Sequence, residues 1–437
     1  MNKALKWDHN VNRIVRDINL EGGRVFATGD CVRNGYYFEP AQSTELFIFD
    51  LNKEDVETIF NLYGTYTTQQ STLRLSFLND HEFTVITDQS PEDFFRDDAL
   101  KRRFTIDTAV YDLLNDRYIM SDQCQTDLDE KVLRVVDEDS FKKDLYNIFE
   151  TAKLIAELEL TATEETVALC REMMSAHQFN ELDREYVYAV YSMILMTPQP
   201  SLGFEFMRQI NALPDYLYDL TNCLQRLDYH PEGNVWNHTM MVIDEGAWLK
   251  RSATDPLSFM WACLLHDIGK PVVTTPEGRA RLHAEVGAII FDKKVDLITD
   301  PDQRKYVEWM IYYHMELMWL SYDSANDHIY RRFLKAIDGT VPLDDLVLIG
   351  QADKLGRGRD NREQIRVFNE YMRNMIARFG KTPEPALVTA DDLREAGLND
   401  EEAYQEILDV AFEYQIEGMN KEEIIRRLVR ESEVYYN

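Results

Sequence analysis

The sequence predicts an α+β fold that is predominantly α-helical, with a small mixed sheet at its start. Strand-like patterns lie before about residue 120, where Ser71 to Leu78 alternates polar and apolar residues as a half-buried strand does. After that point the apolar residues recur at helical spacing. The chain has 437 residues, too many for one ordinary core. We therefore expect an α+β unit, a helical neck, an all-α domain and a helical tail, at residues 1–120, 121–200, 201–378 and 379–437.

The first segment contains three strand candidates and one helix candidate. The helix is expected from Lys53 to Leu62, where apolar residues have helical spacing and Asn52 is placed to cap the first turn. The strands are expected at Arg24 to Thr28, Glu45 to Asp50 and Ser71 to Leu78.

The neck and the third segment are expected to consist of helices. Pro198-Gln199-Pro200 interrupts the helical pattern and marks a domain boundary. Asp255 followed by Pro256 is typical of a helix start, so a helix should run to Ile268 and stop at Gly269. Further helices are expected at Asp139 to Ile155, Glu164 to Met174, Asp183 to Met196, and in the tail near 400–416 and 421–433.

Charge and cysteine content exclude several classes of protein. The formal charge of −31 argues against broad, sequence-independent binding of nucleic acid, which depends on Lys and Arg. The five cysteines are scattered and form no CxxC pair, which is typical of reduced thiols rather than of a disulfide framework. No apolar signal core and no membrane-length apolar run are present, so we expect a cytoplasmic protein without a membrane span.

A His266-Asp267 doublet closes an apolar run and is followed at once by Gly269 and Lys270. Polar groups at the end of a buried helix need partners, because burying them alone is costly. Candidate partners lie on other helical patterns, each on a face that is otherwise apolar. They are His238, His283, His314 and Asp353.

Taken singly, each of these residues has a simple structural explanation. A lone histidine on an apolar face is more often a hydrogen-bonded core residue than a ligand. Asp353 alone could be the partner of Lys354 or Arg357. Together, imidazoles and carboxylates that converge from separate helices are what a divalent metal requires. The candidate ligands are therefore His238, His266, Asp267, His283, His314 and Asp353.

Two segments around these residues resemble a known family. His230 to Met241 and Ala352 to Gly358 are similar to the opening and closing segments of the HD domain in bacterial CCA-adding tRNA nucleotidyltransferases, which belong with the poly(A) polymerases. His238, His266-Asp267 and Asp353 resemble the ligand set of HD-domain phosphohydrolases. The tail from Val388 to Arg427 follows the same family, so the resemblance covers nearly the whole chain.

The resemblance implies metal-dependent hydrolysis of phosphoesters, with one or two Mn, Ni, Co, Mg or Fe ions as cofactor. A bound ion lowers the pKa of its water near neutral pH. Asp267 could bridge two ions, and His283 and His314 could hold the second ion or contact phosphate. Lys270 is placed to stabilise charge on the phosphoryl group. The expected catalytic set is Asp267, Lys270, His283 and His314. The implied substrates are nucleotide or RNA-end phosphates such as 2′,3′-cyclic phosphates, and tRNA remains a candidate partner.

The first half resembles the nucleotidyltransferase head of the same family. Gly29 to Asn34 is similar to its Gly-Gly-x-Val-Arg-Asp turn, and Lys101 to Tyr111 to its Arg-Arg-Asp-Phe-Thr-Ile-Asn segment. Nucleotidyl transfer needs two carboxylates one residue apart on a strand to hold Mg²⁺. The strand expected to carry them keeps one carboxylate at either register, because the partner position is Phe47 or Ile48.

Other positions of the head also lack residues that the family uses for nucleotidyl transfer. Asp30 replaces the second glycine of the turn, and Arg103 replaces the aspartate of the second segment. The segment that reads the base, Lys143 to Glu150, lacks both arginines. We therefore expect an inactive head beside an active HD domain. The alternatives are a tRNA CCA-adding enzyme that remains active despite these changes, and a non-catalytic module that binds nucleotide or RNA.

Overall fold

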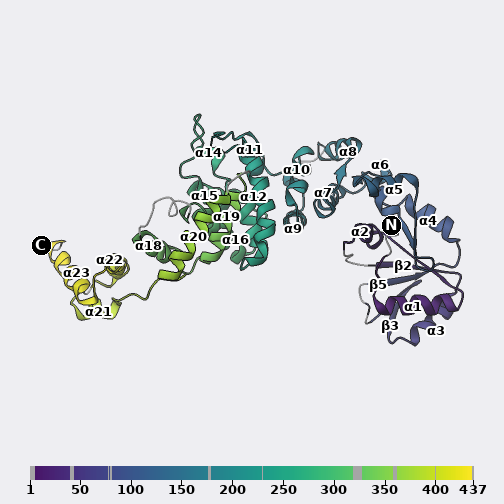
Figure 1. Cartoon of the computed structure of the whole chain (residues 1–437), viewed down its shortest axis with the longest axis horizontal. Helices are drawn as coiled ribbons and strands as arrows, with labels where there is room; N and C mark the ends of the chain where they lie inside the picture. Colours follow the sequence, from purple (N-terminus) through teal and green to yellow (C-terminus); the bar gives the residue numbers. More distant parts are fainter. Residues whose placement is uncertain are drawn as a thin grey trace. The chain divides into compact units, whose positions relative to one another are not determined.

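The computed structural model describes residues 5–39, 44–76, 78, 81–175, 179–228, 230–317, 327–357, 362–398 and 400–435 (Figure 1). Phe77 of the expected strand and Gly358 of the segment beginning at Ala352 lie outside these residues. The chain divides into two compact units, Met1–Pro214 and Asp215–Asn437. The architecture is the mainly helical α+β fold that the sequence predicts.

The first unit is built on a mixed sheet with the strand order β3-β4-β5-β2-β1-β6-β7. Strands β2 and β5 pair in parallel, and the other neighbouring strands pair antiparallel. Helices α1, α2, α3 and α4 belong to this unit, at His9–Leu20, Asp30–Tyr36, Lys53–Asn61 and Pro91–Ala99. The strands are Arg24–Thr28 (β1), Thr44–Phe49 (β2), Tyr66–Gln69 (β3), Thr72–Leu75 (β4), His81–Val85 (β5), Val110–Asp112 (β6) and Arg117–Ile119 (β7).

The expected strands and the expected helix of this unit are present. β1 has the predicted bounds, β2 is shifted by one residue, and β4 occupies the alternating segment. Helix α3 begins after Asn52, whose side chain accepts a hydrogen bond from the backbone amide of Asp55. Alternation along β2 places Glu45 and Phe47 on one face of the sheet and buries Leu46 and Ile48 on the other.

The neck differs from the prediction in two places. The helix expected from Asp139 to Ile155 is divided into α6 (Glu138–Phe141) and α7 (Asn147–Leu158), because Asp144 forms a turn by accepting the amide of Tyr146. The neck also contains α5 (Asp122–Asp129), α8 (Glu164–Ser175) and α9 (Arg184–Leu195).

The boundary expected after Pro200 falls later, at Pro214. Pro200 is the first residue of α10 (Pro200–Gln209), a position where proline is favoured because its missing N–H is not needed. Helix α10 packs against α7 and therefore belongs to the first unit.

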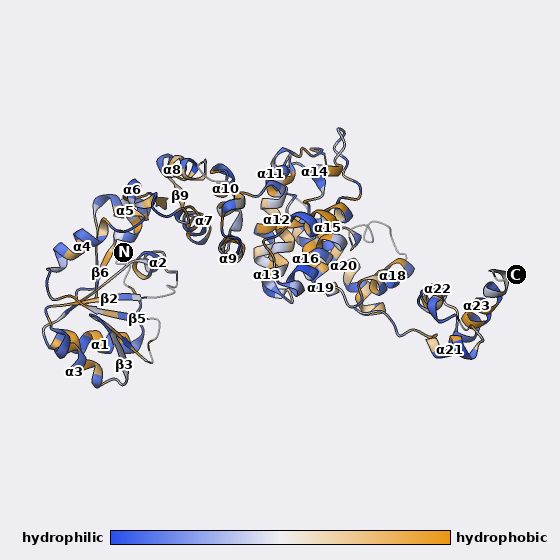
Figure 2. Ribbon diagram, turned by 180° about the vertical axis from the view of Figure 1, so that it is seen from behind, coloured by the Kyte–Doolittle hydropathy of each residue, from blue (hydrophilic) through white to orange (hydrophobic). Residues whose placement is uncertain are grey.

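The second unit surrounds α13 (Pro256–Leu265), which contacts α12, α16 and α19 and whose residues from Ser258 to Leu265 are all buried (Figure 2). A helix that is apolar on every side belongs in a core. It ends at Leu265 rather than at Ile268 as expected. The surrounding helices are Asp215–Asn222 (α11), Val235–Leu249 (α12), Lys270–Val273 (α14), His283–Lys294 (α15), Pro301–Tyr313 (α16), Asp327–Ile337 (α18), Leu343–Leu355 (α19) and Arg362–Phe379 (α20).

The tail forms its own small apolar cluster. Val388, Leu393, Tyr404, Ile424 and Leu428 are buried together. They come from the segments around α21 (Ala390–Glu395), α22 (Tyr404–Ile416) and α23 (Lys421–Tyr435), close to the helices that the sequence predicts there. Among the residues that the structure describes, no helix combines the length and the apolar character needed to cross a membrane.

Candidate metal centre in the helical domain

The His266-Asp267 doublet lies at the end of α13, not inside the helix. His266 is its C-terminal cap, and Asp267 lies in the turn that leads to α14. Both side chains are buried. Their position at a helix end directs both polar groups toward the same space between helices.

Three histidines of this region share one local geometry. Each lies at a helix end and directs its ring Nδ1 to the carbonyl oxygen three residues earlier. An Nδ1–H that donates to a carbonyl leaves the Nε2 lone pair free to bind an ion. The pairs are His266 with Cys263 at 2.9 Å, His283 with Ala280 at 2.8 Å, and His314 with Ile311 at 2.6 Å.

A first group of ligand atoms is formed by His238, His266 and Asp353, from α12, α13 and α19. His238 Nε2 lies 2.9 Å from Asp353 Oδ1 and 3.4 Å from His266 Nε2. Burial lowers the pKa of His238, but the Asp353 and Glu232 carboxylates outweigh burial and raise it. A divalent ion bound at Nε2 would take the place of a proton on this imidazole.

A second group is formed by Asp267, His283 and His314. The Nε2 atoms of the two histidines face each other at 3.2 Å. Burial lowers the pKa of His314 to about 3, helped by the neighbouring His283 and His266, and burial lowers that of His283. Both rings are therefore neutral, and both have Nδ1–H directed to carbonyls, so their facing lone pairs cannot hydrogen-bond to each other.

Asp267 lies between the two groups. Its Oδ2 is 3.2 Å from His266 Nε2 and 3.6 Å from His238 Nε2. Its Oδ1 is 3.4 Å from His283 Nε2 and 3.9 Å from His314 Nε2. Within the described residues Oδ1 accepts no hydrogen bond although it is buried, and Oδ2 faces the ammonium group of Lys270. Facing lone pairs and a buried carboxylate oxygen without a hydrogen bond are the chemistry of a cation site, so the residues present fit a divalent metal.

Two cations balance the carboxylates of the centre. Lys270 Nζ lies 2.6 Å from Asp267 Oδ2, and Arg357 Nη2 lies 2.9 Å from Asp353 Oδ2. Burial opposes ionisation of Asp267, but His266 and Lys270 outweigh it and hold the pKa well below its usual value. Arg357 and His238 do the same for the pKa of Asp353. All six predicted ligands and Lys270 are therefore brought together.

Glu232 is a residue of this centre that the sequence did not single out. Its side chain is buried, and its Oε1 lies 3.1 Å from His238 Nδ1 and 2.8 Å from His230 Nδ1. Burial opposes ionisation, yet the hydrogen bonds from the two histidines lower the pKa of Glu232 to about 2. The available signal was the His-x-Glu spacing of His230 and Glu232, shortly before the first predicted ligand on α12.

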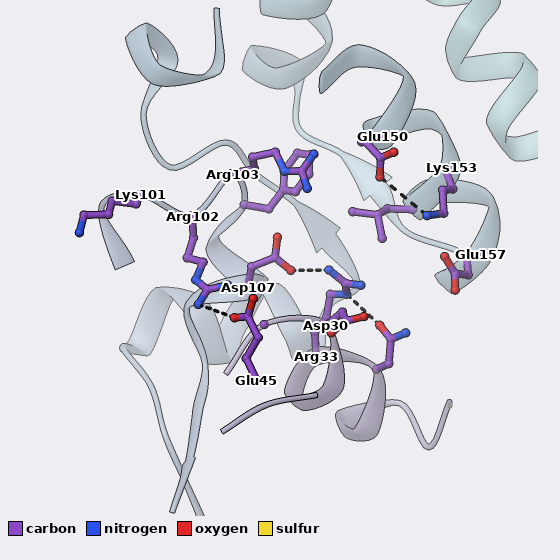
Figure 3. A pocket seen from close by; sticks show the side chains of 14 residues that line it. Asp30, Arg33, Glu45, Lys101, Arg102, Arg103, Asp107, Glu150, Lys153 and Glu157 are labelled. Carbon is purple, nitrogen blue, oxygen red and sulfur yellow. Dashed lines mark hydrogen bonds and ion pairs between the residues drawn. The ribbon is translucent and has the colours of Figure 1, made fainter. Parts of the chain in front are cut away.

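A separate pocket of about 420 Å³ lies in the first unit (Figure 3). Its polar groups are largely occupied by one another. Arg33 pairs with Asp107 at 2.5 Å, and Arg102 pairs with Glu45 at 3.2 Å. Further lining side chains include Asp30, Lys101, Arg103, Glu150, Lys153 and Glu157.

The carboxylate pair required for nucleotidyl transfer is incomplete in this pocket. Glu45 lines the pocket, and its partner position on the same strand face is Phe47, whose ring packs against Phe94 and Phe95. Asp50, the carboxylate of the other register, lies beyond the end of β2 and pairs with Arg24.

The Asp127-x-Asp129 spacing is not a second catalytic pair. Asp127 is buried on α5, accepts a hydrogen bond from Thr105 and pairs with Arg134. Asp129 accepts a hydrogen bond from the hydroxyl of Tyr36. Both carboxylates therefore hold neighbouring segments together.

The comparisons with known proteins define the class of the second unit first. Residues 235–358 match the HD domain family. This range includes the six predicted ligands and Lys270, and it begins just after Glu232.

Individual relatives and solved structures match parts of the chain outside this domain as well. Multifunctional CCA proteins of Haemophilus ducreyi and Acidovorax sp. are 26% and 39% identical over 43% and 34% of this chain, and the matches span 47% and 35% of those relatives. The chain thus matches about half of their length or less. A Thermotoga maritima CCA-adding enzyme complexed with tRNA-CCA shares the fold, with a TM-score of 0.57, 13% identity and coverage of 97% and 96% of the two chains. The resemblance found in the sequence is confirmed: the chain is similar to multifunctional CCA proteins over part of its length, its second unit contains a match to the HD domain, and its fold is that of a CCA-adding enzyme.

Proposed function

We propose that the chain is a metal-dependent phosphohydrolase whose active site is the centre around Asp267. The observation that carries the proposal is the division of this carboxylate between two groups of imidazoles, Oδ2 toward His238 and His266 and Oδ1 toward His283 and His314. A carboxylate between two sets of imidazoles suits a two-ion centre, an arrangement that serves phosphoester hydrolysis.

Each side chain has a defined part in this proposal. When bound, divalent ions act as Lewis acids and lower the pKa of a water to supply hydroxide. His238, His266 and Asp353 would hold one ion, and His283 and His314 the other, with Asp267 shared. Lys270 keeps Asp267 ionised and adds positive charge near the phosphoryl oxygens. A donor set rich in imidazole favours Mn, Co, Ni or Fe over Mg.

The substrates that fit this proposal are phosphoesters of nucleotides or of RNA ends, with 2′,3′-cyclic phosphates as the first to test. The relatives supply the support, since their names refer to the CCA end of tRNA. The formal charge of −31 favours a small substrate over a long stretch of nucleic-acid backbone.

The test is hydrolysis of 2′,3′-cyclic AMP by the full chain, stripped with chelator and reloaded with Mn²⁺, Co²⁺ or Ni²⁺. We expect turnover that His266→Ala abolishes and that Asp292→Asn, an exposed control on α15, leaves intact. Metal binding without turnover of any phosphoester would overturn the proposal and leave a non-catalytic binding module.

A second candidate function is nucleotide addition to tRNA at the pocket of the first unit. The comparisons favour this alternative over phosphohydrolysis, because the matched relatives are named for CCA addition. Arg33, Lys101, Arg102 and Arg103 also provide cations around the pocket. The Phe47 side chain at the second carboxylate position stands against it. Incorporation of labelled CMP or AMP into tRNA lacking its 3′ end would establish this function.

A further inference from the structure

A second cavity with exposed apolar side chains lies next to the proposed metal centre. Leu224 and Val272, which line it, are each about two-thirds or more exposed, at 72% and 67%. Large apolar side chains gathered on one side of a protein often mark a binding site. Leu224 and Val272 line a cavity of about 610 Å³ together with Pro271 and Pro276, a volume typical of small-molecule sites.

The segments that form this cavity are attached directly to the metal centre. The amide of Val235, the first residue of α12, donates to the carbonyl of Cys223 at 3.0 Å, and α12 carries His238. The thiol of Cys223 donates a hydrogen bond to Thr274 Oγ1 at 3.4 Å, and this hydroxyl donates to the carbonyl of Lys270 at 2.6 Å. Helices α11 and α14 also contact each other (Figure 1).

The cavity also carries two polar side chains, Asp219 and Asn222. Both are exposed, and within the described part of the chain neither side chain is used in a hydrogen bond or ion pair. A carboxylate accepts hydrogen bonds from exocyclic amino groups of bases and repels a carbonyl at the same place. Apolar side chains together with hydrogen-bonding groups are the features that hold a single extruded base.

We propose that this cavity binds the nucleobase of the nucleoside phosphate hydrolysed at the metal centre, and that Asp219 favours bases with an exocyclic amine. This inference rests on the proposed phosphohydrolase function. Leu224, Val272 and the two prolines would contact the faces of the base, and Asp219 and Asn222 its edge. The phosphate would then lie toward Lys270, one residue before Pro271 in the chain.

The experiment compares three cyclic phosphates with the Mn²⁺-loaded full chain. They are 2′,3′-cyclic AMP, 2′,3′-cyclic UMP and glycerol 1,2-cyclic phosphate, which has the same strained ring but no base. We expect kcat/KM to fall in that order. The Leu224→Ser/Val272→Ser double variant should raise KM for the nucleotides roughly tenfold, the scale of lost apolar contacts, and leave glycerol 1,2-cyclic phosphate unaffected.

Two further variants make the test specific. Asp219→Ala should reduce the preference for AMP over UMP, whereas Val367→Ser, a control at an exposed apolar position on α20, should change nothing. Equal kcat/KM for all three substrates, or an unchanged KM in the double variant, would overturn the inference alone. Hydrolysis of none of the three would overturn the proposed function and the inference with it.

Discussion

Asp267 is the side chain on which the proposed centre depends, because it is buried, ionised and directed at four imidazoles. Lys270 is its counter-ion and lies against Oδ2, so Oδ1 and the imidazoles that face it remain available to a metal. Three of the histidines are oriented for metal binding, because a backbone carbonyl three residues earlier accepts the Nδ1–H of each ring and fixes its tautomer.

Metal should therefore stabilise the protein through Asp267. An ion at one hundred times its dissociation constant adds about 2.7 kcal/mol to the stability of the bound unit, which corresponds to a rise in Tm of roughly 5 °C or more. We expect this rise when Mn²⁺ is added to the chelator-treated chain in a thermal unfolding experiment. Asp267→Asn should show no rise and Asp292→Asn the full rise, and an equal rise in all three proteins would contradict the assignment.

Glu232 provides a second test at the residue scale. A carboxylate that accepts the Nδ1–H of a ligand histidine orients the ring and strengthens its bond to metal. Glu232→Gln should weaken Mn²⁺ binding about 10- to 100-fold in a chelator competition, while the fold is kept. Glu277→Gln, in an exposed loop, is the matched control. Unchanged affinity in Glu232→Gln would limit this residue to packing.

At the scale of elements, the centre depends on the close approach of α14 and α15. A Cβ on Gly269 would lie 2.0 Å from the carbonyl oxygen of His283 and 2.6 Å from the amide of Gly287. The φ of Gly269 is −78°, which any residue can adopt, so glycine is required here for space. The turn with Asp267 ends α13 before Ile268, which allows this contact.

Gly269→Ala should consequently separate α14 from α15 and displace His283. We expect a loss of about 3 kcal/mol or more, measured as a lower urea midpoint of the metal-free chain, together with weak metal binding. Gly339→Ala is the control, because its Cβ meets nothing and only its left-handed φ of +69° costs about 1 kcal/mol. Equal effects of the two substitutions would show that the backbones at Gly269 can move apart easily.

Sequence patterns predicted the ligand residues better than their places in the helices. The sequence predicted His238 and Asp353 as candidate ligands because each is a lone polar residue on an otherwise apolar helix face. The early end of α13 was missed because the contact at Gly269 is made with α15, a separate segment. Glu232 was missed because it lies in a loop without periodicity, and only the fold places it on His238.

At the scale of the whole molecule, the two units carry two different sites. The sequence located the strands near the pocket, but not that β2 pairs in parallel with β5, because a helix and a hairpin separate them in the chain. The register derived from that sheet now identifies Phe47, and not Ile48, as the residue at the second carboxylate position. The first unit thus has the fold of the CCA-adding enzyme and one carboxylate, Glu45, on this face of β2.

Phe47→Asp should therefore restore chemistry to the first unit. It places two carboxylates on the same face of β2, the arrangement that binds Mg²⁺ for nucleotidyl transfer. We expect Mg²⁺-dependent incorporation of CMP or AMP into tRNA lacking its 3′ end to rise above a near-background wild-type level. Because Phe47 packs on Phe94, Phe47→Ala serves as the control for lost packing. Efficient incorporation by the wild type would contradict the expected inactivity.

The central claim is that the metal centre of the second unit is catalytic, and one measurement tests it most directly. The full chain is loaded with Mn²⁺, its bound metal is quantified, and hydrolysis of 2′,3′-cyclic AMP is followed for the wild type and Asp267→Asn. We expect bound metal and turnover in the wild type and the loss of both in the variant. Turnover that survives in Asp267→Asn, or a metal-loaded wild type without turnover, would contradict it.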